Sequence, residues 1–146
     1  MATLGGVSMT RNPTLAVALI LMALPACRQA EAKPEGDGRT VDVTIHFSHF
    51  EPDRVVVRPG ETVTFVVRNT DPIDHEFILG DEQVQQIHEE GTEPIHAPKS
   101  GEMTVPAGTN QVTTYTFPAR DGQLIFGCHL PGHYAYGMRG LVSIAG

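Results

Sequence analysis

Four side chains with metal-binding atoms stand out in the sequence, and three of them share one short segment. Cys128, His133 and Met138 follow one another with four residues between each pair, and His75 lies in an earlier loop. A thiolate, two imidazoles and a thioether form a soft donor set. Such a set suits copper, with two histidines and a cysteine in a plane and methionine as a weak axial ligand, whereas zinc prefers four short bonds. We therefore predict one copper ion, cycling between Cu(I) and Cu(II), at His75, Cys128, His133 and Met138.

The segment from Cys128 to Met138 can close around a metal only if its two ends are held in place. We expect Cys128 to end a strand, where sheet hydrogen bonds fix its backbone, and Pro131-Gly132 to turn the chain back toward it. Gly137 permits a second bend before Met138. Because one short loop cannot surround a metal, His75 must come from the end of a neighbouring strand. The site is therefore predicted at one end of a sheet structure.

The rest of the sequence predicts mainly strands. Apolar and polar residues alternate from Val41 to Phe47, with Val41, Val43, Ile45 and Phe47 on the buried face. Asp81–Glu90 has helical spacing and an acidic start, which predicts a short amphipathic helix. The other expected strands are Val55–Val57, Thr62–Asn69, Glu76–Leu79, Gln111–Phe117, Gln123–Cys128 and Leu141–Ile144. The expected turns and loops include 50–53, 91–101 and 105–110. We predict an all-β Greek-key sandwich or barrel, antiparallel, with seven or eight strands and one short inserted helix.

The N-terminus has the features of an export signal. Arg11 is the one charged residue before an apolar run over 14–26, which is shorter than the roughly 20 residues that span a bilayer. Leu24-Pro25-Ala26-Cys27 resembles the lipobox of bacterial lipoproteins, in which the cysteine is acylated. Ordinary cleavage after Ala32 is the alternative. We predict a signal peptide over 1–26, a flexible tether over 27–40 and a folded domain over 41–146, in a protein that is periplasmic or lipid-anchored through Cys27.

Length and composition exclude several classes of protein. The 146 residues fit one domain, and 15 glycines and 11 prolines favour turns over a helical bundle. A net charge of −7 argues against nucleic-acid binding, which depends on Lys and Arg meeting phosphate. Two cysteines cannot build a disulfide scaffold. No glycine-rich phosphate loop or serine-elbow motif is present.

Taken together, these segments resemble the cupredoxins, the type 1 blue copper proteins that include plastocyanin and azurin. The resemblance covers about residues 41–146, and the Cys-x4-His-x4-Met spacing is closer to rusticyanin and auracyanin than to plastocyanin. It implies a cupredoxin-like fold and assigns His75, Cys128, His133 and Met138 as the copper ligands. Its further motifs are Phe50-x-Pro, Val57-Arg-Pro-Gly-Glu-Thr-Val-Thr-Phe65, Asn69-x-Asp, His75-Glu-Phe and Gly140-x-Val142.

Three features depart from the cupredoxin pattern. Glu76 stands where plastocyanin and azurin carry an asparagine that ties the ligand loops together; the acid either lowers the reduction potential or faces solvent. His129 replaces the usual Ser or Thr, and in an extended segment its side chain should point away from the metal. The segment from Asp81 to Met103 resembles an insertion found in periplasmic cupredoxin-like proteins linked to copper handling.

The expected function is one-electron transfer in the bacterial cell envelope, with a cytochrome or an oxidase as redox partner and a monomeric chain. The electron would leave through His133, beside Pro131, Tyr134 and Tyr136. The alternative is a periplasmic copper-binding or copper-tolerance protein that sequesters or delivers the metal. Enzymatic activity is not expected. Gly127 precedes Cys128 where multicopper oxidases carry a histidine, and no second copper site of the nitrite-reductase kind is evident.

The remaining histidines are expected to be ordinary surface residues. One open question is whether His88, His96 and Met103 form a second, weak copper site.

Overall fold

The computed structural model describes residues 1–2, 38–91 and 99–146. Residues 3–37, which hold nearly all of the predicted signal peptide and tether, lie outside this description, as does His96. The described residues form nine strands and one α-helix. In chain order these are β1 (Arg39–His46), β2 (His49–Glu51), β3 (Arg54–Val57), β4 (Thr62–Asn69), β5 (His75–Gly80), α1 (Glu82–Glu89), β6 (Glu102–Val105), β7 (Asn110–Thr116), β8 (Gly122–Gly127) and β9 (Arg139–Ile144).

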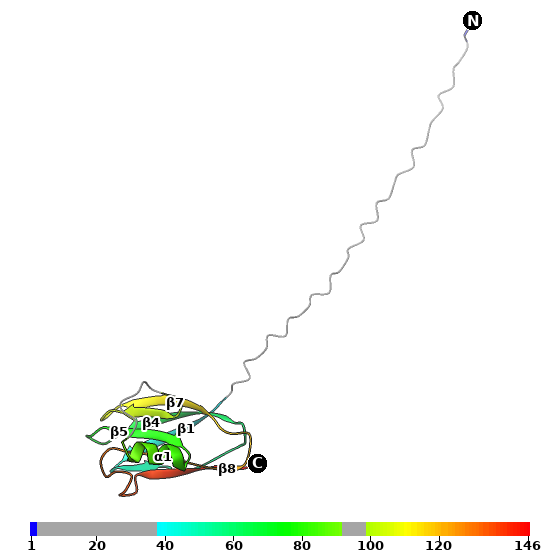
Figure 1. The fold of residues 1–146 in the computed structure, drawn as a ribbon. Helices are drawn as coiled ribbons and strands as arrows, with labels where there is room; N and C mark the ends of the chain where they lie inside the picture. The colour runs from blue at the N-terminus through cyan, green and yellow to red at the C-terminus, as the bar shows by residue number, and fades with distance from the viewer. Residues whose placement is uncertain (3–37, 92–98) are drawn as a thin grey trace. The chain divides into compact units, whose positions relative to one another are not determined.

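The strands form two sheets packed as a sandwich (Figure 1). One sheet has the order β2-β1-β4-β7 and the other β3-β9-β8-β5-β6, and α1 packs against β5 and β8 of the second sheet. The all-β class is therefore confirmed. Purely antiparallel pairing is wrong, because β1 runs parallel to β4 and β3 runs parallel to β9.

The core between the sheets follows the alternation that the sequence predicts. Val63, Phe65 and Val67 of β4 are fully buried, while the intervening residues are partly exposed. Five phenylalanines meet in this core, and each contributes about 1.5–3 kcal/mol when fully buried. The rings of Phe77 and Phe126, from the neighbouring strands β5 and β8, stack with centroids 5.3 Å apart. This rigid core holds the ends of β5 and β8, from which the candidate metal site is built.

The first hairpin corrects the prediction for Phe47. The β1 strand ends at His46, which pairs with His49 of β2, so Phe47 and Ser48 form a two-residue turn. Both have positive φ angles, +48° and +56°, as a type I′ turn requires. Phe47 is consequently 78% exposed instead of buried. The expected turn over 50–53 is also wrong in part, because Phe50 lies within β2 and is buried.

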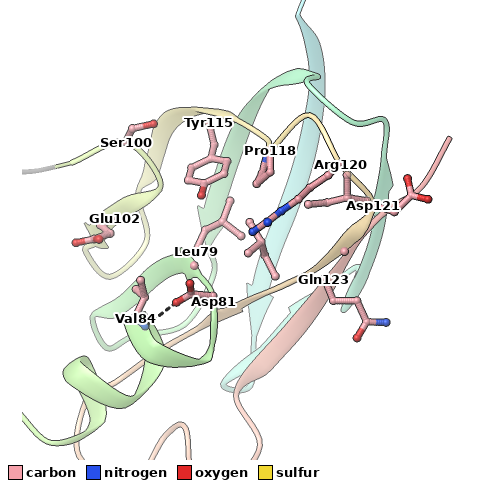
Figure 2. Close-up of a pocket in the computed structure, with 14 residues that line it drawn as sticks. Leu79, Asp81, Val84, Ser100, Glu102, Tyr115, Pro118, Arg120, Asp121 and Gln123 are labelled. Carbon is pink, nitrogen blue, oxygen red and sulfur yellow. Dashed lines mark hydrogen bonds between the residues drawn. The ribbon is translucent and has the colours of Figure 1, made fainter.

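The inserted helix is confirmed, and it begins where the acidic residues indicate. Asp81 is its N-cap, and the Asp81 carboxylate accepts a hydrogen bond from the backbone N–H of Val84 at 3.0 Å (Figure 2). After the undescribed residues 92–98, the chain forms β6, which pairs with β5 in register Phe77↔Met103. With β2 and β6 included, the described residues hold nine strands instead of the expected seven or eight.

Candidate metal centre

The pairing of β5 with β8 brings His75 and Cys128 to one end of the sheet. These strands are antiparallel, with Ile78 of β5 opposite Gly127 of β8. His75 begins β5, and Cys128 follows the last residue of β8. The start of one strand therefore lies beside the end of the other, as the sequence predicts.

The segment after Cys128 is closed by β9 and by its own backbone hydrogen bonds. Because β8 and β9 are antiparallel, with Gly127 opposite Arg139, the loop returns to its starting point. The Cys128 N–H donates to the carbonyl of Met138 at 3.2 Å, and the Met138 N–H donates to the carbonyl of His133 at 2.9 Å. Gly132 and Gly137 have φ angles of +83° and +97°, which L-residues with a Cβ rarely adopt. The two glycines permit the bends that were predicted for this loop.

Three donor atoms converge at this end of the sandwich. The Sγ atom of Cys128 lies 3.3 Å from Nδ1 of His133 and 3.9 Å from Nδ1 of His75. All three atoms lie within 4.8 Å of one another. Metal–nitrogen and metal–sulfur bonds of about 2.0 and 2.3 Å would separate nitrogen from sulfur by about 3.6 Å. The donor set therefore matches one metal ion in both spacing and chemistry.

The three side chains differ in their access to solvent. Cys128 and His75 are fully buried, whereas His133 is partly exposed. The exposed Pro131 and Tyr136, which is 91% exposed, come from the same loop as His133. His133 is therefore the member of the cluster nearest to the surface.

Asp71 fixes the orientation of the His75 ring. The Nε2–H of His75 donates to Oδ2 of Asp71 at 2.9 Å, because a carboxylate can only accept. Nδ1 is then the unprotonated nitrogen, and it is the atom that faces Cys128. Burial lowers the pKa of His75, although the Asp71 carboxylate opposes this effect. The net shift of the His75 pKa is downward, so the ring is neutral near neutral pH and Nδ1 is available to bind a metal.

Asp71 is a site residue that the sequence reasoning did not assign. Besides His75, its carboxylate accepts hydrogen bonds from the backbone N–H groups of Phe47 at 2.7 Å and Ser48 at 2.8 Å. Burial raises the pKa of Asp71, but these hydrogen bonds outweigh it and the net shift is downward. The Oδ1 atom of Asn69 accepts from the Asp71 N–H at 2.9 Å. The Asn69-x-Asp motif was the signal in the sequence, and its geometry explains why both residues are needed.

Two opposing effects act on the pKa of the Cys128 thiol. Burial raises the pKa of Cys128, while the backbone N–H groups of Glu76 and Leu130 lower it by hydrogen bonding to the sulfur. The Glu76 N–H lies 3.3 Å from Sγ. Without a metal the thiol therefore stays protonated near neutral pH, and metal binding must release this proton.

Glu76 joins the two segments that carry the buried ligands. Its backbone N–H donates to Cys128, and its Oε2 atom accepts the backbone N–H of His129 at 3.1 Å. The suggestion that Glu76 simply faces solvent is therefore wrong. A carboxylate here makes the connection between the loops for which plastocyanin and azurin use an asparagine.

The His129 ring points toward α1, in the direction that the sequence predicts. Its Nδ1 lies 3.0 Å from Oε2 of Glu89, and its Nε2 lies 2.8 Å from Oε1 of Gln85. The ring of Tyr134 stacks on the ring of His129, with centroids 4.5 Å apart. Gln85 is itself buried, and its Nε2 donates to the carbonyls of Ile78 and Ile125. The inserted helix therefore holds the residue that follows Cys128.

Met138 ends the loop that carries Cys128 and His133, and its side chain is buried, with 2% exposed. Its backbone bonds to Cys128 and His133 keep it beside both, and its assignment as the axial ligand stays a prediction. The open question of a second site at His88, His96 and Met103 includes His96, which lies outside the described residues. Met103 packs into the hydrophobic core, whereas His88 contacts Glu102, the neighbouring residue on the other face of β6.

The sandwich also has a cavity of about 500 Å³, and Figure 2 shows residues that line it. It is lined by Gly80 and Asp81 at the far end of β5 and by Gly122 and Gln123 at the start of β8. These are the strand ends opposite His75 and Cys128, so the cavity is a separate feature. No helix among the described residues is long and apolar enough to cross a membrane.

The sequence is similar to a known domain family and to named copper proteins. The sequence profile of the cupredoxin-like domain matches residues 14–120, a range that ends before Cys128. The copper-resistant cuproprotein CopI of Pseudomonas aeruginosa is 28% identical, covering 84% of this chain and 86% of its own. The protein of that name from Rubrivivax gelatinosus is 35% identical, covering 73% of this chain and 66% of its own.

Solved structures share the fold. An auracyanin from Roseiflexus castenholzii superposes with a TM-score of 0.61 at 24% identity, covering 73% of this chain and 97% of its own. Auracyanin A from Chloroflexus aurantiacus, a blue copper protein, gives a TM-score of 0.58 at 22% identity, covering 73% and 98%. With the profile match and the converging Cys–His–His cluster, these likenesses lead to one conclusion: the chain is a copper-binding protein of the cupredoxin-like family.

Proposed function

We propose that the chain holds one copper ion as a type 1 centre. The ligands are Nδ1 of His75, Nδ1 of His133 and the thiolate of Cys128, with the thioether of Met138 as a weak axial donor. The observation that carries this proposal is the convergence of three donor atoms within 4.8 Å. The Asp71 carboxylate and the Glu76 N–H orient two of them without themselves being ligands. Bound copper would supply a one-electron change between Cu(I) and Cu(II).

The role that we propose for this centre is copper tolerance in the cell envelope. Relatives that match most of this chain are named copper-resistant cuproproteins, which supports the role. The chain's own contribution is to bind copper in a mostly buried pocket that is preorganised by Asp71 and Glu76. The proposed role is copper binding and not enzymatic turnover. We further propose that the protein is exported and monomeric.

A direct test is copper sensitivity in the organism that carries the gene. Deletion should lower the copper concentration that the cells tolerate, and the wild-type gene should restore it. A gene with Cys128→Ser should not restore tolerance. A gene with Cys27→Ser, which alters the other cysteine, shows how much of any loss comes from Cys27 and not from the copper site. Equal tolerance in deleted and intact cells would overturn the proposed role.

One-electron transfer to a redox partner is the second candidate, and the exposure of His133 favours it. This ring is the most accessible part of the cluster, and the exposed Pro131 and Tyr136 lie in its loop. A carrier should exchange electrons rapidly with a c-type cytochrome, and its loss should slow respiration without added copper. A tolerance protein should show its phenotype only when copper is in excess.

The location that we propose depends on Cys27 and its flanking residues. Acylation would anchor the domain to a membrane through a segment without large apolar side chains. More than one acyl chain is needed for stable anchoring, because each buried methylene contributes about 0.8 kcal/mol. Mass spectrometry of the mature N-terminus should find an acylated Cys27. An unmodified chain that starts at Lys33 would contradict the anchor but not the copper site.

A further inference from the structure

Two histidines flank the turn between β1 and β2, and neither belongs to the cluster around Cys128. His46 and His49 are direct partners across the hairpin. Side chains of such a pair lie on the same face of the sheet, with Cβ atoms about 4.5–5.5 Å apart. Both residues are exposed. The hairpin therefore presents two imidazoles side by side to solvent.

The hydrogen bonds of His49 fix which of its nitrogens is free. Its Nδ1 lies 2.7 Å from the carbonyl oxygen of Phe47. A carbonyl oxygen only accepts hydrogen bonds, so Nδ1 carries the proton and donates it. Nε2 is then the unprotonated nitrogen of the neutral ring. An Nδ1–H held by a backbone carbonyl is a common arrangement in metal-binding histidines, where it orients the ring and raises the basicity of the other nitrogen.

The same result follows for His46 by one further step. Its Nδ1 lies 3.0 Å from Oγ1 of Thr70. The Thr70 hydroxyl donates its own proton to the carbonyl of Ile45 at 2.7 Å, so Oγ1 accepts from His46. Nδ1 of His46 is therefore the protonated nitrogen, and Nε2 is free. Both rings of the pair carry their metal-binding lone pair on the same atom.

The hairpin is held rigidly enough to present this pair. The Asp71 carboxylate accepts hydrogen bonds from the N–H groups of both turn residues, Phe47 and Ser48. Glu51 is exposed and lies two residues after His49 in β2, so it is on the same face. His46, His49 and Glu51 also line a shared surface cavity of about 520 Å³. Glu51 thus lies on the same face as the two imidazoles, although its oxygens do not converge with their nitrogens as a cluster of three donors.

We propose that His46 and His49 form a second metal site, which binds Cu(II) through their two Nε2 atoms. Water would complete the coordination. A set of nitrogen and oxygen donors without sulfur suits Cu(II) better than Cu(I), and among divalent first-row metals such sites bind Cu(II) most tightly. The site shares no ligand with the cluster around Cys128. Its existence does not depend on the function proposed for that cluster.

The test begins with protein that already holds one equivalent of copper. A second equivalent of Cu(II) is added, and binding is followed by calorimetry and by electron paramagnetic resonance. We expect a second Cu(II) signal with splitting from two imidazole nitrogens and no new thiolate absorption. His46→Ala and His49→Ala should each abolish this second signal. The visible spectrum of the first copper should be unchanged in both variants, which also verifies their folding.

Two further variants make the test specific. Thr70→Val keeps the shape of the side chain but removes the acceptor of His46, and should weaken the second site about tenfold. The control is His88→Ala, which removes a histidine from α1 and should leave the second site intact. Second-site binding that survives both His46→Ala and His49→Ala would overturn the proposal. So would Zn(II) binding that is as tight as Cu(II) binding, because the assignment to copper rests on the donor set.

The ring protonation is measurable without any copper. Long-range proton–nitrogen NMR spectra of the metal-free wild type should show Nδ1–H and unprotonated Nε2 for both His46 and His49 at a pH where the rings are neutral. Cu(II) added beyond the first equivalent should broaden the signals of these two rings together. An Nε2–H form in either ring would contradict the inferred geometry.

Discussion

Asp71 and His75 form a buried pair in which Oδ2 of the carboxylate lies 2.9 Å from Nε2 of the ring. The same carboxylate accepts hydrogen bonds from the turn between β1 and β2. One side chain therefore sets the orientation of a copper ligand and also holds a turn whose two residues have positive φ angles. The metal centre and the adjacent hairpin are coupled through this residue.

Asp71→Asn should destabilise the metal-free protein by about 1–3 kcal/mol, because an amide cannot accept at both positions and leaves a buried donor unsatisfied. The effect should depend on pH. The pKa of Asp71 in the folded protein is below its ordinary value of 3.8, so its contribution is complete above that pH and is lost as the pH falls through the folded pKa. Urea unfolding at several pH values measures this.

The matched control for Asp71 is Asp74→Asn in the same loop. Asp74 is exposed and accepts one hydrogen bond, from the N–H of Ala107. Its replacement should change the unfolding free energy by less than about 1 kcal/mol. Equal losses of unfolding free energy in the two variants would contradict this account. So would a loss in Asp71→Asn that does not become smaller as the pH is lowered.

Glu76 should influence both the fold of the ligand loops and the reduction potential. Glu76→Gln retains an oxygen that can accept from the His129 N–H but removes a negative charge, and so should raise the potential by favouring Cu(I). Glu76→Ala should also cost about 0.5–1.5 kcal/mol of stability through the lost hydrogen bond. Voltammetry and thermal unfolding separate the two effects. The control is Glu82→Gln, which makes the same charge change on the exposed start of α1. If Glu82→Gln shifted the reduction potential as much as Glu76→Gln, the effect would not depend on the place of Glu76 between the ligand segments.

Gln85 and Gln86 are neighbours on α1 with opposite environments. Gln85 is buried and bonds to Ile78, Ile125 and His129, whereas the Gln86 amide donates to the exposed Glu90. Gln85→Ala should lower the unfolding free energy by about 1–3 kcal/mol, because it leaves buried groups without partners. Gln86→Ala should stay within about 0.5 kcal/mol of the wild type. Chemical unfolding of both variants measures the difference. Similar losses of unfolding free energy would show that the buried hydrogen bonds of Gln85 do not stabilise the fold.

Met138 should tune the reduction potential if it is the axial ligand. A stronger oxygen donor favours Cu(II), so Met138→Gln should lower the potential while copper stays bound. Met138→Leu removes the donor and should raise it. Met103→Leu is the control, since Met103 is also buried but packs in the core. Unchanged potentials in both Met138 variants would exclude the axial role.

The sequence predicted those parts of the site that depend on chain order and residue chemistry. Cys128, His133 and the loop glycines lie in one segment, and His75 lies at the start of a recognisable strand, so strand pairing brings them together. The all-β fold follows from the same alternation of apolar residues. These features are local or periodic, and sequence patterns report them well.

The features that the sequence did not reveal depend on contacts between distant segments. Phe47 continued the apolar alternation, but the chain turns there with a positive φ angle, and the turn N–H groups donate to the distant Asp71 carboxylate. The partners of Glu76 and His129 lie 40 residues or more away in the chain. The short strand β6 has too few residues for a period to be evident. Side-chain hydrogen bonds of this kind leave no spacing signature.

The most direct test of the copper centre is the visible absorption spectrum of the purified protein with one equivalent of Cu(II). We predict an intense thiolate-to-copper band that ascorbate bleaches and that Cys128→Ser abolishes. Cys27→Ser, which alters the other cysteine of the chain, should leave the band unchanged. A colourless copper complex, or a band that persists in Cys128→Ser, would contradict the assignment of Cys128 as a copper ligand and with it the type 1 centre.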